Sequence, residues 1–381
     1  MPRFTAVVSL AAPVVAAFLV FLAGCGSDVN TADSGAGPVP APGTSSVADS
    51  APEAVGTNLT TPSGAADPAV PEKSGAAESL LDPALPDYKP TEGVSGTIKS
   101  VGSDTMNNLM TLWQEGFRKF YPNVKIEIEG KGSSSAPPAL IEGSAAFGPM
   151  SREMKESEID GFEAKFGYPP TELATSIDML AVYVHKDNSI QGLTLPQADA
   201  IFSKMRKLGY STDIRTWGEV GLSGEWANQP ISLYGRNPAS GTYGYFKEHV
   251  LGNGDYKDTV KQQPGSSSVV QAVGRERYAI GYSGIGYRTA DVRPVPLAEE
   301  SSGPFVEAAP KNAYSGEYPL ARPLLLYLNY RPGSELDPLR REFLKYIFSR
   351  PGQSDVVKDG YLPVTTENAK DALSTVGIKT P

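Results

Sequence analysis

Three turns in this sequence combine glycine with serine or threonine, each between a predicted strand and a predicted helix. They read Gly-Ser-Asp-Thr-Met at 102–106, Gly-Ser-Ser-Ser at 132–135 and Ser-Gly-Thr at 240–242. The first amides of a helix have no intrahelical acceptor and carry partial positive charge, so they attract anions. Hydroxyls add neutral donors, and glycine lets the backbone approach a ligand. The turns therefore predict an anion-binding site.

Two arginines stand beside these turns in the sequence. Arg236 precedes Ser240 by four residues, and Arg152 follows Ser151. A guanidinium can donate two parallel hydrogen bonds to the oxygens of one anion. Capping alone could explain any one turn, because serine, threonine and aspartate are preferred N-caps without a ligand. A fourth turn, Pro-Gly-Ser-Ser-Ser at 264–268, is interpreted as such a cap.

Alternating strands and helices must position these residues. Apolar runs and alternation predict strands at 97–101, 124–128, 147–150, 179–185, 231–234 and 324–327. Apolar residues at helical spacing and capping signals predict helices at 106–120, 138–142, 242–250 and 336–348. This alternation is typical of an α/β protein whose sheets are covered by helices on both sides.

The composition excludes several functional classes. Hydrophobic residues make up 40% of the chain and aromatic residues 9%, which is enough for a packed core. A net charge of −9 argues against a nucleic-acid-binding protein. One cysteine and two distant histidines, His185 and His249, disfavour a disulfide framework and a metal site. No nucleophile-elbow or Walker motif is present, so we expect no cofactor and no phosphatase activity.

Residues 1–25 have the pattern of an export signal. Arg3 is the only charged residue, 4–22 is apolar, and Leu-Ala-Gly precedes Cys25. This ending resembles a bacterial lipobox, in which the cysteine becomes the lipidated, palmitate-bearing first residue of the mature protein. An uncleaved membrane anchor with an incidental cysteine is the alternative. No other stretch approaches the ~20 apolar residues that a membrane span needs.

Residues 26–93 are predicted to form a disordered, acidic tether. They are rich in alanine, proline, glycine and serine, and they hold ten acidic residues but only two basic ones. Their one aromatic residue is Tyr88. Such a segment has too little apolar surface to order itself. The rest of the chain is close to neutral, so an anionic ligand meets no large repulsive field there.

From 94 to 381, the chain resembles the phosphate-binding proteins of bacterial ABC transporters, the PstS-like group of periplasmic binding proteins. The resemblance rests on the order of Val-Gly-Ser-Asp-Thr-Met at 101–106, Gly-Ser-Ser at 132–134, Met-Ser-Arg at 150–152, Arg236 with 240–242, and Ala-Ile-Gly-Tyr at 279–282. It implies a two-lobed periplasmic-binding-protein fold (type II), with two mixed sheets flanked by helices and joined by two crossover strands.

The resemblance also implies boundaries and partners. The crossovers would lie near 179–185 and 324–330, so that lobe one is 94–180 plus 325–381 and lobe two is 181–324. The lobes would close on inorganic phosphate and deliver it to the permease subunits of an ABC transporter. We expect an exported monomer, anchored by lipid in the periplasm or on the outer face of the cell membrane. Another tetrahedral oxyanion, or a surface lipoprotein with an adhesive role, is the alternative.

The family pattern assigns phosphate ligands residue by residue. They are Thr105, Ser133 and Met106 through its backbone N–H from lobe one, with Ser103 as a further donor, and Arg236, Ser240, Gly241 and Thr242 from lobe two. Ser151 and Arg152 are additional candidates, because they offer a second hydroxyl and a second guanidinium.

Three positions depart from the family pattern. Ala146 and Ser151 stand where members place acidic residues, whose carboxylate can accept the proton of HPO₄²⁻ and repel sulfate. Asp104 is the remaining local carboxylate and the candidate proton acceptor, with a helix N-cap as its alternative role. Pro238 replaces an acidic residue of some members, so Arg236 is expected to be held differently.

Overall fold

The computed structural model of this chain describes residues 80–379, and both Cys25 and residues 26–79 of the predicted tether lie outside that range. The strands are β1 Thr97–Val101, β2 Lys125–Glu129, β3 Gly148–Met150, β4 Thr171–His185, β5 Leu193–Thr194, β6 Ser232–Arg236, β7 Lys261–Gln263, β8 Ala279–Gly284, β9 Val292–Pro294, β10 Leu297–Ala298, β11 Ala321–Leu328 and β12 Leu362–Pro363. The helices are α2 Asn107–Arg118, α3 Ala136–Glu142, α4 Glu156–Phe166, α5 Leu195–Phe202, α6 Gly241–His249, α7 Ser266–Arg275, α8 Pro310–Ser315, α9 Pro338–Ile347, α10 Arg350–Lys358 and α11 Thr366–Thr375. Within 80–379, no helix is both long and apolar enough to span a bilayer.

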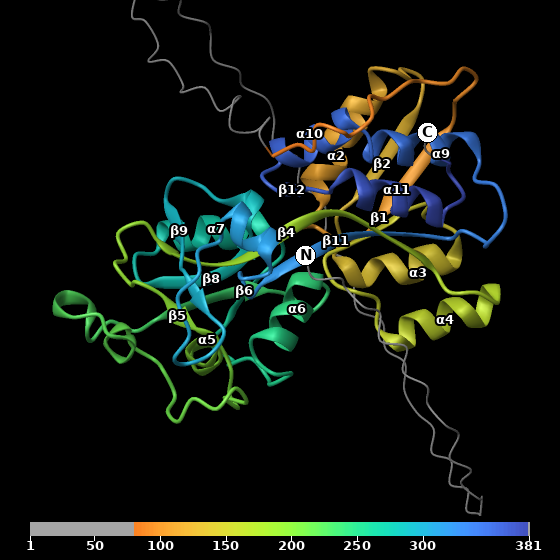
Figure 1. The fold of residues 1–381 in the computed structure, drawn as a ribbon. Helices are drawn as coiled ribbons and strands as arrows, with labels where there is room; N and C mark the ends of the chain where they lie inside the picture. The colour runs from red at the N-terminus through yellow and green to blue at the C-terminus, as the bar shows by residue number, and fades with distance from the viewer. Residues whose placement is uncertain (1–79, 380–381) are drawn as a thin grey trace, which may run out of the picture. The chain divides into compact units, whose positions relative to one another are not determined.

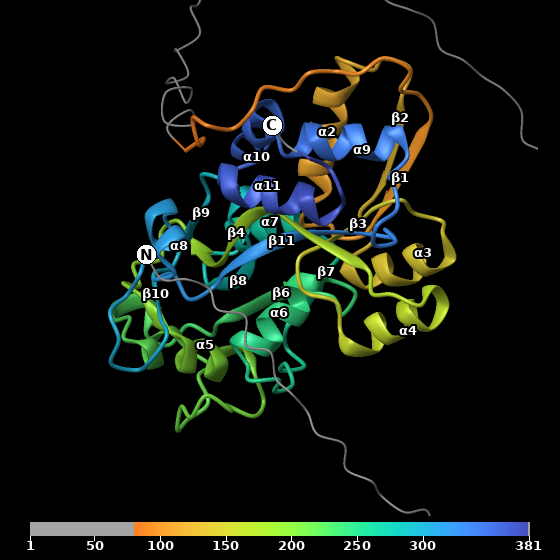
Figure 2. The same cartoon turned by 45° about the vertical axis from the view of Figure 1, so that its right-hand side comes forward.

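The strand β4 joins the sheets of two lobes. Its first half, Thr171 to Met179, pairs antiparallel with β11, and its second half, from Leu180, pairs antiparallel with β8. The resulting order is β3-β11-β4-β8-β6-β7, and β9 and β12 also pair with β4. Figures 1 and 2 show β4 and β11 side by side between the two halves. These two strands are the crossovers of the expected two-lobed α/β fold.

The position of the crossovers differs slightly from the expectation. Met179 was predicted to begin a strand, but β4 already begins at Thr171. All of β11 pairs with the lobe-one half of β4, so residues 321–324 lie in lobe one rather than in lobe two. The chain passes between lobes at Leu320, whose carbonyl accepts the N–H of Leu180 at 3.0 Å.

Each lobe has its own hydrophobic core. In lobe one, Trp113 and Phe117 of α2 pack with Phe343 of α9. In lobe two, Phe246 of α6 stacks on Tyr282 of β8 at 3.9 Å between ring centroids. Burial of each such side chain stabilises the folded lobe by ~2 kcal/mol. The strands that pack on these cores therefore have fixed positions, and so do the turns at their ends.

The prediction of a tether that runs to residue 93 is wrong for residues 80–93. Leu85 and Tyr88 are 2% and 8% exposed and belong to the core of lobe one. Pro86 also accepts a hydrogen bond from the Arg350 amide at 2.8 Å. The composition of this segment did not predict its order, because two apolar side chains are enough to fix a short segment when they pack into a core formed by the rest of the lobe. We call residues 80–93 the N-terminal strap.

Candidate functional site

Three serines of lobe one meet at the carboxyl ends of β1, β2 and β3. The Ser103 hydroxyl donates to the Ser151 hydroxyl at 3.0 Å, and the Ser133 and Ser151 hydroxyl oxygens lie 3.3 Å apart. The Ser151 amide donates to the Ser133 hydroxyl at 3.1 Å. All three residues are at most 2% exposed. The predicted turns therefore converge, and Ser151 places its hydroxyl between those of Ser103 and Ser133.

Lobe two brings the start of α6 against these serines. A Cβ added to Gly241 would lie 2.3 Å from the Ser133 hydroxyl and 2.6 Å from the Ser151 hydroxyl. The Thr242 hydroxyl lies 2.9 Å from that of Thr105 in lobe one. Only glycine permits this approach, so the amides at the start of α6 face a group of hydroxyls. We call Ser103, Thr105, Ser133, Ser151 and Thr242 the hydroxyl cluster.

Arg236 ends β6 and is almost fully buried, with 1% of its surface exposed. Its NH1 donates to the Ser266 hydroxyl at 2.6 Å, and its NH2 lies 3.2 Å from Asp104 Oδ2. Burial lowers the pKa of Arg236, and the charge of Asp104 partly opposes that shift. The Nε is buried and has no hydrogen-bond partner among the described residues. A buried cationic donor without an acceptor is costly, so this atom marks a place for an anion oxygen.

Asp104 and Ser266 have roles that the sequence did not indicate. Asp104 does not cap α2, which follows Met106 and has no side-chain cap. Its Oδ2 instead accepts the N–H of Ser266 at 2.8 Å, from the opposite lobe. The interpretation of the 264–268 turn as a simple cap is wrong, because the N-cap of α7 is Gly265 and the Ser266 hydroxyl contacts Arg236.

A second buried ion pair lies on the crossover strands and was missed. Arg322 of β11 donates to Asp178 Oδ2 of β4 through Nε at 3.1 Å and NH2 at 2.9 Å. Its NH2 also donates to the Thr242 hydroxyl, and its NH1 to the Ser151 carbonyl, both at 2.8 Å. The sequence held a signal for this pair, because Asp178 and Arg322 each lie in a mostly apolar strand and a buried charge requires a partner.

Three other predicted ligands, Met106, Ser240 and Arg152, have contacts outside the hydroxyl cluster. Met106 is fully buried at the N-cap of α2, so its amide lies at the helix start as expected. The Ser240 hydroxyl accepts the Tyr243 amide at 3.4 Å as the cap of α6. Arg152 does not join the cluster, because both of its terminal nitrogens donate to Glu158, at 2.8 and 2.7 Å. The assignment of Arg152 as an anion ligand stays a prediction, and in this structure its guanidinium is paired with Glu158.

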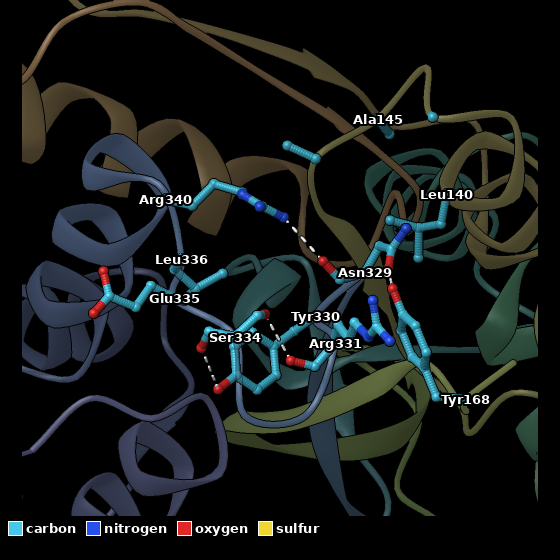
Figure 3. A pocket seen from close by; sticks show the side chains of 12 residues that line it. Leu140, Ala145, Tyr168, Asn329, Tyr330, Arg331, Ser334, Glu335, Leu336 and Arg340 are labelled. Carbon is cyan, nitrogen blue, oxygen red and sulfur yellow. Dashed lines mark hydrogen bonds between the residues drawn. The ribbon is translucent and has the colours of Figure 1, made fainter. Parts of the chain in front are cut away.

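Ala146 lies away from the hydroxyl cluster. It lines a separate pocket of about 440 Å³ in lobe one. Figure 3 shows Tyr168, Asn329 and Arg340 in the same pocket. In that pocket, Arg340 NH1 donates to the Asn329 carbonyl at 3.0 Å, and the Tyr168 hydroxyl donates to the Asn329 side chain at 2.8 Å. No residue of the hydroxyl cluster lines this pocket.

A groove of about 860 Å³ between the lobes reaches the edge of the cluster. Ser151, Arg152 and Arg322 line it beside Ser240 and Tyr243 of lobe two. The lobes are closed over the cluster itself, where the hydroxyls of facing threonines are in contact. A small anion held there would be surrounded by both lobes, while the groove leads outward from its edge.

The two histidines lie apart from the hydroxyl cluster. His185 Nδ1 accepts the amide of Asp187 at 3.2 Å, and the His249 ring packs against Tyr245 at 4.1 Å between centroids. No group of three or more metal-ligating side chains occurs between residues 80 and 379. The groups gathered at the cluster are hydroxyl, amide and guanidinium donors, which suit the oxygens of an anion.

Comparison with known proteins gives consistent matches. Residues 88–351 match the family model described as a PBP superfamily domain. The chain is 52% identical to the phosphate-binding protein PstS of Pseudomonas aeruginosa over 305 residues, which is 80% of this chain and 94% of that protein. It is 28% identical to PstS of Staphylococcus haemolyticus, over 74% of this chain and 85% of that one.

Solved structures show the same similarity. A protein from Clostridium perfringens with bound phosphate, described as a putative phosphate ABC transporter substrate-binding protein, is 27% identical with a TM-score of 0.60. The match covers 71% of this chain and all of that one. A protein from Planctomyces limnophilus, described as a possible phosphate-binding protein, is also 27% identical, with a TM-score of 0.54, over 74% of this chain and 98% of that one.

Proposed function

Since this chain belongs to the PBP superfamily, in the family of the PstS phosphate-binding proteins, we propose that it binds inorganic phosphate between its two lobes. The proposed ligands are the hydroxyls of Ser103, Thr105, Ser133, Ser151, Ser240 and Thr242, the guanidinium of Arg236, and the amides of Met106, Gly241 and Thr242. Binding breaks no bond, so the chain acts as a solute-binding protein and not as an enzyme.

The buried Nε of Arg236 carries this proposal. It is a cationic donor without a partner among residues 80–379, on the strand that leads into α6. Arg322, the other buried arginine beside the cluster, is paired with Asp178, whereas Arg236 keeps its Nε free of the ion pair that its NH2 forms with Asp104. An anion would therefore be held by neutral hydroxyls and amides around one guanidinium, which suits a small ion with several acceptor oxygens.

We further propose that the chain delivers phosphate to the permease subunits of an ABC transporter outside the cytoplasm. Support for export and lipid anchoring comes from the apolar segment that ends in Leu-Ala-Gly before Cys25. A monomer suffices for this role, because both walls of the site belong to one chain.

Calorimetric titration of the full chain with phosphate, sulfate and arsenate tests the proposal. Arg236→Ala should weaken phosphate binding roughly 30- to 5000-fold, because the loss of one side of a desolvated charge pair costs about 2 to 5 kcal/mol. Arg236→Lys should recover only part, since an ammonium cannot form the two-pronged contact.

Titration of the unmodified chain also separates the alternatives. Sulfate binding as tight as phosphate binding would identify a general oxyanion-binding protein, to which the hydroxyl of Ser151 in place of a carboxylate would be suited. Binding of none of the three anions would contradict the proposal and favour a surface lipoprotein that retains the fold. Phosphate release from a phosphate ester would contradict the assignment as a non-enzyme.

A further inference from the structure

We propose that Asp104 is an interlobe latch, which supplies the counter-ion of Arg236 from the opposite lobe so that the ion pair forms only when the lobes close. The proposal rests on the proposed binding of phosphate. It assigns Asp104 a positioning role, in which its carboxylate holds the lobes and Arg236 in place and does not contact the ligand.

The contacts of the Asp104 carboxylate all cross between lobes. Asp104 belongs to the turn that follows β1 in lobe one, and its Oδ2 reaches Arg236 NH2 at 3.2 Å and the Ser266 amide at 2.8 Å in lobe two. Backbone carbonyls of the same turn also accept hydrogen bonds from lobe two. Tyr287 of lobe two donates its hydroxyl to the carbonyls of Asp104 and Thr105, at 3.0 and 3.2 Å.

Lobe two offers Arg236 only neutral partners of its own. Arg236 NH1 donates to the Ser266 hydroxyl at 2.6 Å, and NH2 to the Pro264 carbonyl at 3.4 Å. Among residues 80–379, Asp104 is the only carboxylate within ion-pair distance of Arg236. Proline occupies position 238, two residues after Arg236, so no side chain there can take this role.

Closure of the lobes therefore buries Arg236 and gives it a counter-ion. In the closed structure the guanidinium is 1% exposed, and a cation withdrawn from water requires a counter-charge. In separated lobes Asp104 and Arg236 would each be hydrated. The ion pair is thus an interaction of the closed state alone, and it raises the population of that state. Since phosphate is enclosed only there, the latch should slow its release.

The opposite expectation follows if Asp104 is merely a nearby negative charge. Such a charge repels an anion, so its removal would tighten phosphate binding. The latch predicts the reverse, because an unpaired Arg236 disfavours closure. The sign of the change in affinity therefore separates the two roles.

The first test compares the full chain with its Asp104→Asn variant, using inorganic phosphate as the probe. We expect affinity to fall by about tenfold or more, with a matching rise in the dissociation rate measured by stopped flow. Asp213→Asn is the matched control, because Asp213 has similar exposure, 26% against 25%, and its ion pair with Lys257 lies within lobe two. It should change neither quantity. Unchanged or tighter binding in Asp104→Asn overturns the latch.

A second measurement reports closure directly. Cys25 is the only native cysteine, so spin labels at Lys119→Cys in lobe one and Lys207→Cys in lobe two of the full Cys25→Ser chain are unambiguous. Both lysines are exposed. With saturating phosphate, the wild-type distance should be short and narrow, and Asp104→Asn should add a longer component. Identical distributions overturn the proposal.

Two further results complete the test. Sulfate should bind Asp104→Asn no more tightly than wild type, whereas a gain would make Asp104 a ligand contact and overturn the positioning role.

Asp104→Ser, which also lacks the carboxylate, should reproduce the loss of phosphate affinity and the longer label distance if Asp104→Asn folds poorly. If wild type binds no phosphate, the proposed function fails. The label distances without phosphate then still show whether Asp104 holds the lobes together.

Discussion

Gly241 lies at the start of α6, directly against the hydroxyls of Ser133 and Ser151 in the other lobe. A methyl group there would overlap both oxygens in the closed state, but it would meet neither once the lobes separate. We therefore expect Gly241→Ala to weaken phosphate binding by more than about tenfold, at ~1.4 kcal/mol per factor of ten, without unfolding the protein. Calorimetry and thermal unfolding measure the two effects.

Gly161→Ala in α4 is the control for this substitution. Its added Cβ would lie 3.6 Å from Ile141, which is ordinary contact. Because alanine is a better helix former than glycine by ~1 kcal/mol, Gly161→Ala should raise stability and leave phosphate affinity unchanged. Equal affinities for Gly241→Ala and wild type would show that the lobes need not approach as closely as they do here.

Asp359 should make stability depend on pH. Burial raises the pKa of this carboxyl from 3.8 to about 6, and its Oδ2 is buried without a partner among the described residues. The folded state therefore binds a proton more tightly than the unfolded state. Protonated Asp359 therefore contributes to the free energy of unfolding below about pH 4. This contribution, ~2 to 3 kcal/mol, is lost as the pH rises through about 6.

Asp359→Asn removes this titration. The free energy of unfolding of the variant, relative to wild type, should rise by about 2 kcal/mol between about pH 4 and pH 7.5. Urea denaturation at the two pH values measures it. Asp371→Asn, at an exposed position in α11, is the control. A pH-independent difference would mean that Asp359 does not titrate in this range.

At the scale of elements, the N-terminal strap is part of lobe one. The Tyr88 hydroxyl donates to Glu342 Oε2 at 2.9 Å, and its ring meets Tyr346 edge-on at 5.5 Å. Asp82 Oδ2 accepts the first amide of α11, from Thr366, at 2.8 Å. The strap thus contacts both α9 and the start of α11.

Two deletions should separate the strap from the rest of the predicted tether. Removal of 26–79 should leave stability unchanged and phosphate affinity within about threefold, under ~1 kcal/mol. Removal of 26–93 should lower the free energy of unfolding by about 3 kcal/mol or more, because the core loses Leu85 and Tyr88. Thermal and urea unfolding compare them. Equal stabilities would show that the strap adds nothing to the core.

At the scale of the whole molecule, the proposed role requires a soluble binding unit held near a membrane. The mature chain should begin at Cys25 and carry the mass of attached lipid. Cys25→Ser should lack that lipid, while phosphate affinity should stay the same, because the site lies far along the chain in the two lobes. Mass spectrometry of the membrane fraction and calorimetry of the variant measure the two. A mature N-terminus at any other residue would contradict the lipobox.

Local features of this protein could be predicted from its sequence. The helix predicted at 106–120 is α2 and the one at 336–348 is α9, because apolar spacing reports which face of a helix is buried. The three turns that carry hydroxyls were also found, since capping and glycine chemistry act over a few residues. The order of these motifs was enough to indicate the two-lobed fold.

Partners between distant segments were decided only by the tertiary structure. Asp178 and Arg322 are 144 residues apart, and they meet because β4 and β11 pair as the crossover strands. Asp104 and Arg236 are also distant in the sequence, and they meet because the turn after β1 lies against the end of β6. Neither local periodicity nor composition records which lobe a side chain will face. That depends on how two separately folded cores close on each other, and so on the summed packing of both lobes.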